Sequence, residues 1–295
     1  MRVVHLTDLH VQVRPRAREL LNKRLAATAN LYLMGRRHKF DVATQRAAVQ
    51  AAMAQRPDVV VITGDLTAQA TPAEFQEARN LLAPILERVP TVVIPGNHDT
   101  YVPEAVRHDH MGHYFGDWMG PERRLPYLVQ HGDVAFLAIE SCRAHLLSSG
   151  YTPPEQLEGA AALLDGAGWG PDRPFVFLLV HYPLRGRDGQ PYGPSTRALS
   201  NAAAVEAFLA GTDRVDAVLH GHEHHGFRTE LPGAAGPIPV LDPGASGYAL
   251  VADHDRTAHF NVYEVDRAGL HAVHRHRWDG RAFHPEPGGA YATGR

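Results

Sequence analysis

Residues of the types that bind metal ions follow five short apolar runs in the sequence. They are Asp8 and His10, Asp65, Asn97 with His98 and Asp99, His181, and His222 with His224. Each apolar run is rich in Val, Ile or Leu and has the composition of a buried strand. Because the carboxyl ends of strands converge in an open α/β sheet, we expect these side chains to meet in space. Nitrogen and oxygen donors without a thiolate indicate a site for Mn, Fe, Zn or Co, and not a Cys-rich structural zinc site.

The spacing within the series also indicates metal binding. Asp8 and His10 are two residues apart, so in an extended segment both side chains point to the same side and can bind one ion. His222 and His224 are also two residues apart and can bind one ion in the same way. Glycine precedes Asp65, Asn97 and His222. Glycine suits turns where the backbone passes close to an ion. Any one of these residues alone is more often a turn former or a core group, so the ordered series carries the argument.

Apolar runs alternate with longer alanine-rich stretches, which is the pattern of a layered α/β protein. We predict strands at 2–7, 58–63, 91–94, 133–139, 175–180, 217–220, 240–241, 260–265 and 270–278, the last two forming a hairpin. Helices are predicted at 44–55, 72–87, 154–165 and 200–210. The stretches 185–195 and 232–239 are rich in Gly and Pro and are predicted to be loops.

Bulk composition predicts an ordinary globular enzyme. The net charge of −3 and the pI near 6.7 give no general attraction to nucleic acid or anionic lipid. Cys142 is the single cysteine, so no intrachain disulfide can form. No signal peptide is visible, and no apolar run approaches the roughly 20 residues of a transmembrane helix. We therefore expect a cytoplasmic protein without a transmembrane segment.

No linker long enough to divide the chain is visible, so we predict one domain over 1–279 and a weakly ordered tail at 280–295. A basic helical insertion at about 11–40 interrupts that domain. It carries Arg14, Arg16, Arg18, Lys23, Arg24, Arg36, Arg37 and Lys39. Leu21, Leu25, Ala29 and Tyr32 stand at helical spacing in it. The insertion is interpreted as a solvated helix that can pack on a neighbouring subunit, as a rim that steers phosphate, or as a surface for anionic lipid or nucleic acid.

The series Asp-x-His, Gly-Asp, Gly-Asn-His-Asp, His and Gly-His-x-His, from Asp8 to His224, resembles the calcineurin-like metallophosphoesterase superfamily. The resemblance implies an α/β fold in which two sheets form a sandwich flanked by helices, with a dinuclear metal site at one edge. It also implies two divalent ions per chain, Mn, Fe or Zn. Asp8, His10 and His224 would hold the first ion, Asn97, His181 and His222 the second, and Asp65 would bridge them.

The same resemblance assigns the chemistry. Two ions that share a hydroxide can make it nucleophilic near neutral pH and stabilise in-line displacement at phosphorus. His98 would face the leaving oxygen as a general acid or phosphate donor, and Asp99 would orient a ligand or His98. A scaffold without catalysis is the rival class, but such a protein is expected to have lost ligands that this chain keeps.

Departures from subfamily patterns narrow the prediction. Ala68 stands where purple acid phosphatases carry tyrosine, His10 stands where they carry glycine, and the protein Ser/Thr phosphatase motifs are absent. The full pattern is most similar to class III cyclic-nucleotide phosphodiesterases and related bacterial phosphodiesterases. It also resembles lipid-linked nucleotide pyrophosphohydrolases and nucleases. We therefore expect a phosphodiesterase that acts on cyclic nucleotides or other small phosphodiesters, with these relatives as alternatives.

Three residues are candidate substrate contacts. His113 lies in an aromatic and histidine-rich stretch after the Asn97 motif, and Arg185 and Arg187 follow His181. The histidine could wall a pocket and the arginines could bind a phosphate. A surface position explains His113 equally well, and a solvated loop is the more common explanation for the two arginines.

Overall fold

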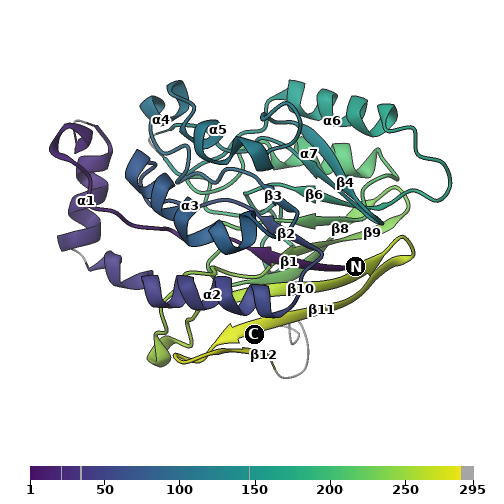
Figure 1. The fold of residues 1–295 in the computed structure, drawn as a ribbon. Coiled ribbons are helices and arrows are strands. Elements are labelled where there is room, and N and C mark those ends of the chain that lie inside the picture. The colour runs from purple at the N-terminus through teal and green to yellow at the C-terminus, as the bar shows by residue number, and fades with distance from the viewer. Residues whose placement is uncertain (21, 34, 146, 287–295) are drawn as a thin grey trace.

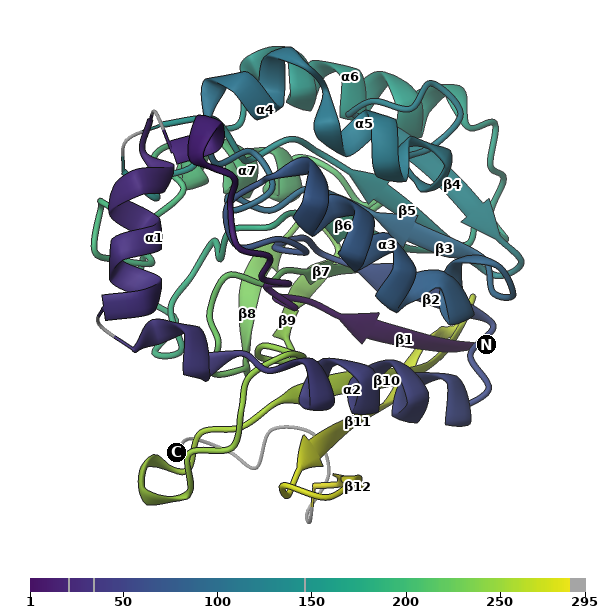
Figure 2. The same ribbon diagram turned by 60° about the vertical axis from the view of Figure 1, so that its left-hand side comes forward.

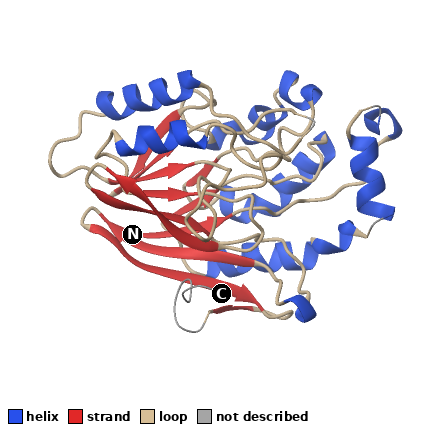
Figure 3. Ribbon diagram, turned by 180° about the vertical axis from the view of Figure 1, so that it is seen from behind, coloured by secondary structure: helices blue, strands red, loops and turns tan. Residues whose placement is uncertain are grey.

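Two six-stranded mixed sheets form the centre of the protein in a computed structural model that describes residues 1–20, 22–33, 35–145 and 147–286. The first sheet has the order β12 (Phe283–Pro285), β11 (Gly269–Trp278), β10 (His259–Asp266), β1 (Arg2–Leu6), β2 (Val59–Ile62) and β3 (Thr91–Val93). The second has the order β4 (Tyr127–His131), β5 (Val134–Ala138), β6 (Phe175–Leu179), β7 (Ala217–Leu219), β9 (Gly236–Asp242) and β8 (Phe227–Gly233). Figure 3 shows the strands with helices above them and to the right, while the strands near the C-terminal mark run along the lower edge.

Helices cover the outer sides of both sheets. They are α1 (Arg24–Leu33), α2 (Val42–Ala54), α3 (Pro72–Leu86), α4 (Pro103–Arg107), α5 (His110–Phe115), α6 (Pro154–Gly166) and α7 (Ala202–Ala210). Short 3₁₀ helices occur at Ala17–Leu20, Arg36–Lys39, Gly116–Trp118 and Ala252–His254. Figure 1 shows α6 and α7 on one side of the molecule and α2 on the other. The predicted two-sheet α/β fold is confirmed.

Alternate side chains of the central strands pack into two different apolar clusters. In β5, Phe136 packs into the apolar cluster that joins the two sheets, whereas its neighbour Leu137 packs into the cluster beneath α6 and α7. In β6, Phe177 and Leu178 divide in the same way. Successive side chains of a strand point to opposite faces, so a sheet covered on both faces needs an almost continuous apolar run. Both strands have that composition.

The parallel strands set the place of the site. β1 pairs in parallel with β2 and β2 with β3, while β5, β6, β7 and β9 are parallel neighbours in the second sheet. Their carboxyl ends therefore lie at one edge of each sheet. None of the helices among the described residues has the length and apolar character needed to span a membrane.

Several elements differ from those predicted. β4 was not predicted, and the stretch 232–239 predicted as a loop is largely a β8–β9 hairpin. Its prolines are tolerated because β9 pairs with β7 only through Val240 and Leu241, beyond the prolines. Within the predicted tail, β12 pairs with β11. Residues 287–295 lie outside the described part of the chain.

The basic segment contains the predicted helix, α1, but its packing differs from the expectation. Figure 2 shows α1 on the side of the molecule toward which β1 points. Leu25 and Tyr32, expected on an apolar stripe, are 59% and 39% exposed, and Leu21 lies outside the described residues. Arg24 was expected in solvent, yet it is only 1% exposed. The anchor of this helix is therefore a buried cation.

Arg24 joins α1 to the loop that follows β2. Its Nε donates to the carbonyl of Gln69 at 2.9 Å, and its Nη2 donates to the carbonyl of Ala70 at 2.7 Å. Its Nη1 donates to Glu104 on α4 at 2.6 Å. Charge-assisted bonds of this kind are stronger than neutral ones. They fix α1 against two segments that are distant from it in sequence.

Candidate metal centre

The predicted ligands lie at the carboxyl ends of parallel strands from both sheets. Asp8 and His10 follow β1, Asp65 follows β2, Asn97 follows β3, His181 follows β6, and His222 and His224 follow β7. The structure brings these side chains into two adjoining groups of possible metal donors, Asp8 with His10 and His224, and Asp65 with His181 and His222. The convergence expected from the sequence is therefore present.

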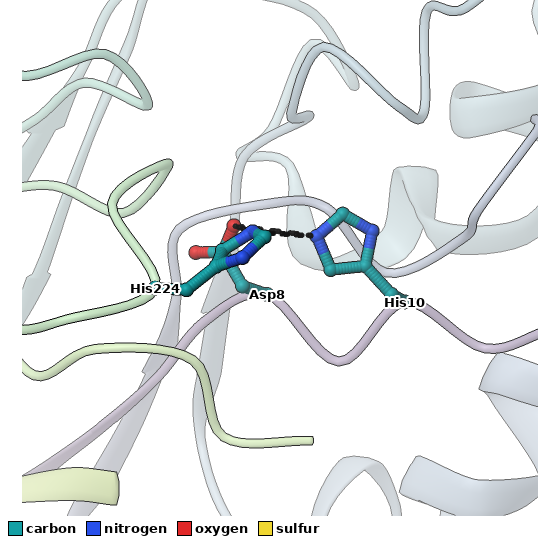
Figure 4. Close-up of side chains that lie close together, drawn as sticks. All are labelled: Asp8, His10 and His224. Carbon is teal, nitrogen blue, oxygen red and sulfur yellow. Dashed lines mark hydrogen bonds and ion pairs between the residues drawn. The ribbon is translucent and has the colours of Figure 1, made fainter. Parts of the chain in front are cut away.

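The first group consists of Asp8, His10 and His224 (Figure 4). Asp8 Oδ1 lies 3.6 Å from Nε2 of His10 and 3.6 Å from Nε2 of His224. The two Nε2 atoms lie 3.3 Å apart. Ligand atoms about 2.0–2.2 Å from a tetrahedral ion are separated by roughly 3.3–3.6 Å, so this spacing suits a shared ion.

The second group is built around the amide oxygen of Asn97. Oδ1 of Asn97 lies 3.1 Å from Nε2 of His181 and 2.8 Å from Nδ1 of His222. Nδ1 of His181 donates to the carbonyl of Thr63 at 2.7 Å. A neutral His181 therefore keeps its lone pair on Nε2, facing the group, as ligand histidines do when the other nitrogen is bound by a backbone carbonyl.

Asp65 lies between the two groups. Its Oδ2 is 3.5 Å from Nε2 of His10, and its Oδ1 is 3.5 Å from Nε2 of His181. One carboxylate thus presents one oxygen to each group. Asp65 is only 1% exposed, so water does not compete for these oxygens. This arrangement is the one expected of a bridging ligand.

Unsatisfied donor atoms at the centre fit a pair of cations. Asp8 Oδ1 and Nε2 of His222 are buried and accept or donate no hydrogen bond among the described residues. In a neutral His181 the lone pair on Nε2 faces the amide oxygen of Asn97. Two acceptors repel each other at this distance unless a positive charge lies nearby. Burial disfavours the His181 imidazolium, yet the Asp65 carboxylate raises its pKa to about 9. The centre therefore attracts positive charge.

Left-handed backbone is concentrated at the ligands. Asp8, His10, Asp65 and His222 have φ values of 51°, 50°, 53° and 72°. Such values are uncommon outside glycine and cost roughly 1–3 kcal/mol per residue where they are held. We expected Asp8 and His10 to lie in extended backbone, and this expectation was wrong. Their side chains meet because two left-handed residues turn the loop.

Two of the predicted glycines allow loops to touch ligand carboxylates. A Cβ at Gly96 would lie 2.1 Å from Oδ1 of Asp65. A Cβ at Gly221 would lie 2.6 Å from Oδ2 of Asp8 and 2.1 Å from the hydroxyl of Thr7. No side chain fits at either position without moving a ligand. The close backbone approach predicted from the sequence is present at both glycines.

His98 lies beside the two groups on the cavity side. Its Nδ1 donates to the carbonyl of Ala68 at 2.6 Å, and its backbone N–H donates to Asp65 Oδ1 at 2.7 Å. Its ring packs edge-on against His10, with centroids 4.7 Å apart, and stacks on Tyr101 at 5.4 Å. Burial lowers the pKa of His98 to about 4. His98 also forms a donor group with His10 and Asp65, so its geometry alone permits metal binding.

Asp99 joins two ligand loops instead of orienting a histidine. Its Oδ1 accepts from the N–H and the hydroxyl of Thr67, both at 2.9 Å. Its Oδ2 accepts from the N–H of Gly96 at 2.9 Å and of Leu66 at 3.2 Å. These bonds hold the loop of Asp65 against the loop of Asn97. The expected contact with a ligand or with the His98 ring is replaced by this tether.

A cavity of about 700 Å³ opens onto the centre. His10, Asp65, Asn97, His98, His222 and His224 line its base. Phe40, from the basic segment, packs on His10 with ring centroids 4.3 Å apart and on His224 at 5.2 Å. Tyr248 packs on Phe40 at 5.3 Å. Aromatic rings therefore shield the first group on the side of the N-terminal segment.

The three predicted substrate contacts lie elsewhere. His113 is exposed on α5, and Arg185 forms a two-pronged ion pair with Glu206 at 2.5 and 2.6 Å. Arg187 donates to the carbonyl of His225 at 3.1 Å. None of the three lines the cavity. Proximity in sequence to a ligand motif was a poor guide, because each strand end is followed by a loop that turns away.

Five charged residues besides Asp65 line the cavity. They are Lys23, Lys39, Arg197, Glu223 and Arg256. Arg197 lies 3.5 Å from Glu223, which also accepts a hydrogen bond from the hydroxyl of Tyr192. Only the excess of basic residues at 11–40 signalled two of these positions, and nothing in the sequence signalled Arg197 or Arg256.

The fold and the paired donor groups agree with the family found by comparison with known proteins. A family model described as calcineurin-like phosphoesterase matches residues 1–226. The protein belongs to this family, whose members depend on a dinuclear metal centre. The expected family is thereby confirmed.

Individual relatives agree with this assignment. The glycerophosphodiester phosphodiesterase GpdQ of Enterobacter lignolyticus (strain SCF1) is 27% identical over 174 residues. That match covers 58% of this chain and 57% of GpdQ, so the similarity spans little more than half of that relative.

Two solved structures share the fold at low identity. A dimetal phosphatase from Danio rerio has a TM-score of 0.60 and 13% identity, over 96% of this chain and 98% of that one. The purple acid phosphatase PPD1 from yellow lupin (Lupinus luteus) seeds has a TM-score of 0.60 and 15% identity, over 96% of this chain and 52% of that one. At these identities the likeness concerns the fold alone.

Proposed function

We propose that this protein is a phosphodiesterase that hydrolyses small phosphodiesters, cyclic nucleotides or glycerophosphodiesters among them, at two divalent metal ions. The observation that carries the proposal is the sharing of Asp65 by two donor groups at the base of a cavity of about 700 Å³. Cavities of this size suit small-molecule substrates. The similarity to a protein named as a glycerophosphodiester phosphodiesterase supports a diester over a monoester.

Each proposed ion has its own set of ligands, and one carboxylate is shared. In this proposal Asp8, His10 and His224 hold one ion, Asn97, His181 and His222 hold the other, and Asp65 bridges them. Nitrogen and oxygen donors without sulfur favour Mn, Fe or Zn. When bound, two such ions supply Lewis-acid charge and lower the pKa of water enough to provide a nucleophile near neutral pH.

His98 is assigned to the leaving oxygen. Because its Nδ1–H donates to Ala68, its Nε2 carries a proton only in the imidazolium form. Burial keeps the pKa of this ring low, at about 4. A phosphate anion bound nearby favours the charged ring, so substrate binding is expected to help load the proton that His98 then donates.

A substrate panel tests the proposal. The full chain, loaded with Mn²⁺, Fe²⁺ or Zn²⁺, is assayed with 3′,5′-cyclic AMP, glycerophosphoethanolamine, a nucleotide-sugar lipid, single-stranded DNA and a phosphomonoester. Hydrolysis of a small diester faster than of the monoester is the expected result. Preferred cleavage of the DNA would favour a nuclease, and preferred cleavage of the lipid would favour a pyrophosphohydrolase. Faster monoester hydrolysis would contradict the proposal.

A further inference from the structure

The cavity above the metal centre is lined by four cationic side chains, which we call the cationic rim: Lys23, Lys39, Arg197 and Arg256. The carboxylates that line it are Asp65, a candidate metal ligand, and Glu223, which lies 3.5 Å from Arg197. No carboxylate of the described residues lies within ion-pair distance of Lys23 or Arg256. The rim therefore carries positive charge in excess of what its own acids neutralise.

Lysine is rare in this protein, and its placement is unusual. Of the 29 lysines and arginines, only Lys23 and Lys39 are lysines, and both line this cavity. Arginines carry the structural ion pairs, such as Arg24 with Glu104 and Arg185 with Glu206. Lysine presents a compact charge with three donors on a flexible stem, which suits an anion that arrives and leaves.

Lys23 is held beside His98 by an aromatic ring. Its Nζ lies 4.0 Å from the centroid of the Tyr101 ring and donates to the carbonyl of His145 at 2.8 Å. The same Tyr101 ring stacks on the ring of His98, with centroids 5.4 Å apart and planes 15° apart. One carbonyl and one ring face leave a further N–H of the ammonium for a ligand. The Tyr101 ring thus contacts both Lys23 and His98, the residue assigned to the leaving oxygen.

The ammonium of Lys23 is only partly hydrated. Burial lowers its pKa from the ordinary value. A cation that has lost hydration and has no carboxylate partner regains stability when an anion binds to it. The environment of Lys23 therefore favours a negatively charged ligand group on the His98 side of the cavity.

We propose that Lys23 binds a second anionic group of the substrate, a carboxylate or phosphate carried by the leaving group. This proposal rests on the phosphodiesterase function proposed above and narrows its substrates to diesters with a negative charge besides that of the scissile phosphate. Cyclic nucleotides, which lack such a group, and choline esters, whose quaternary ammonium meets the cationic rim, are poor substrates on this account.

Three chromogenic diesters test the proposal with the metal-loaded full chain. They are methyl 4-nitrophenyl phosphate, its analogue with a 3-carboxylate on the nitrophenyl ring, and the analogue with a 3-carboxamide. The last two leaving groups have nearly the same shape and differ in charge. We expect kcat/KM to be about tenfold higher for the carboxylate than for the carboxamide, because a charged hydrogen bond contributes on this order.

Three variants test whether Lys23 causes the preference for the carboxylate ester. Lys23→Met should remove the preference for the carboxylate ester, mainly through KM, and Lys23→Arg should retain most of it. Arg18→Met, which changes an exposed cation of the same segment outside the cavity, is the matched control and should keep the preference. Circular dichroism and metal content establish that each variant is folded and loaded.

The outcomes separate the two proposals. Diester hydrolysis without a preference for the carboxylate, or an equal loss on both analogues in Lys23→Met, overturns the role of Lys23 and leaves the phosphodiesterase function standing. If the metal-loaded enzyme hydrolyses none of the three diesters, the phosphodiesterase function is wrong and the role of Lys23 falls with it.

Discussion

The imidazoles of His10 and His224 face each other with their Nε2 atoms 3.3 Å apart. Both atoms lie 3.6 Å from the same oxygen of Asp8. Two neutral rings can share that space only if one Nε2 carries the proton, whereas a cation can bind both lone pairs at once. The geometry of the pair is therefore explained most simply by the ion that the family requires.

Asp65→Asn should reduce metal content in both groups. Its two oxygens face His10 and His181, and an amide offers a single, uncharged oxygen in their place. Asn97→Ala should weaken mainly the second ion, because its oxygen contacts only His181 and His222. Elemental analysis after dialysis measures ions per folded chain. An Asp65→Asn protein that retains two ions would rule out the bridging role.

His98→Ala should have an effect that depends on the leaving group. p-Nitrophenolate departs without a proton and an alkoxide does not, so the loss should be small with a p-nitrophenyl ester and about 10²–10⁴-fold with an alkyl ester. Steady-state kinetics on both substrates gives the comparison with the same nucleophile. Equal losses would show that His98 only binds phosphate. Loss of an ion would make it a ligand, which its contact with Asp65 and His10 permits.

Arg24→Met should lower the free energy of unfolding by about 2–4 kcal/mol, because it leaves two buried carbonyls and Glu104 without their donor. Urea denaturation at fixed metal concentration measures the change. Arg18→Met, at an exposed position of the same segment, should stay within about 0.5 kcal/mol of the parent. Equal effects of the two substitutions would mean that the buried guanidinium does not anchor α1.

Glu74→Gln should change how stability depends on pH. Burial raises the pKa of Glu74 from 4.5 to about 7. Between these values the folded state keeps the proton and the unfolded state loses it, so the free energy of unfolding of the parent falls as the pH rises. The variant lacks this slope and should gain about 3 kcal/mol relative to the parent between pH 4.5 and pH 7.5.

Urea denaturation across that pH range, at saturating metal, measures the difference. Glu77→Gln, at an exposed position of the same helix, serves as the control. A constant offset between Glu74→Gln and the parent at all pH values would show that Glu74 ionises normally in the folded protein.

The convergence of the candidate ligands could be predicted from sequence because each of them follows the end of a strand. Strand ends of parallel sheets converge by topology, so Asp8 and His224 meet although the chain between them is long. The local geometry could not be predicted. Asp8 and His10 adopt left-handed backbone where extended backbone was assumed, because loop conformation depends on contacts such as those of Gly221 and Thr7 with Asp8.

The wall of the cavity was harder to predict than its base. Arg197 and Arg256 reach the cavity from loops that carry no motif, and Phe40 reaches His10 from the end of the basic segment. Conversely, Arg185 is adjacent to the His181 motif but pairs with Glu206 on α7. Side chains that bind substrate are placed by tertiary packing, which neither spacing nor composition encodes.

The ligands belong to both sheets, since Asp8, Asp65 and Asn97 follow strands of one sheet and His181, His222 and His224 follow strands of the other. Two ions bound by this set would join the two layers of the sandwich. Ligands that bind only the folded state stabilise it, so metal-loaded protein should unfold and be cleaved by proteases more slowly than metal-free protein. Metal supply would then set the lifetime of the folded molecule.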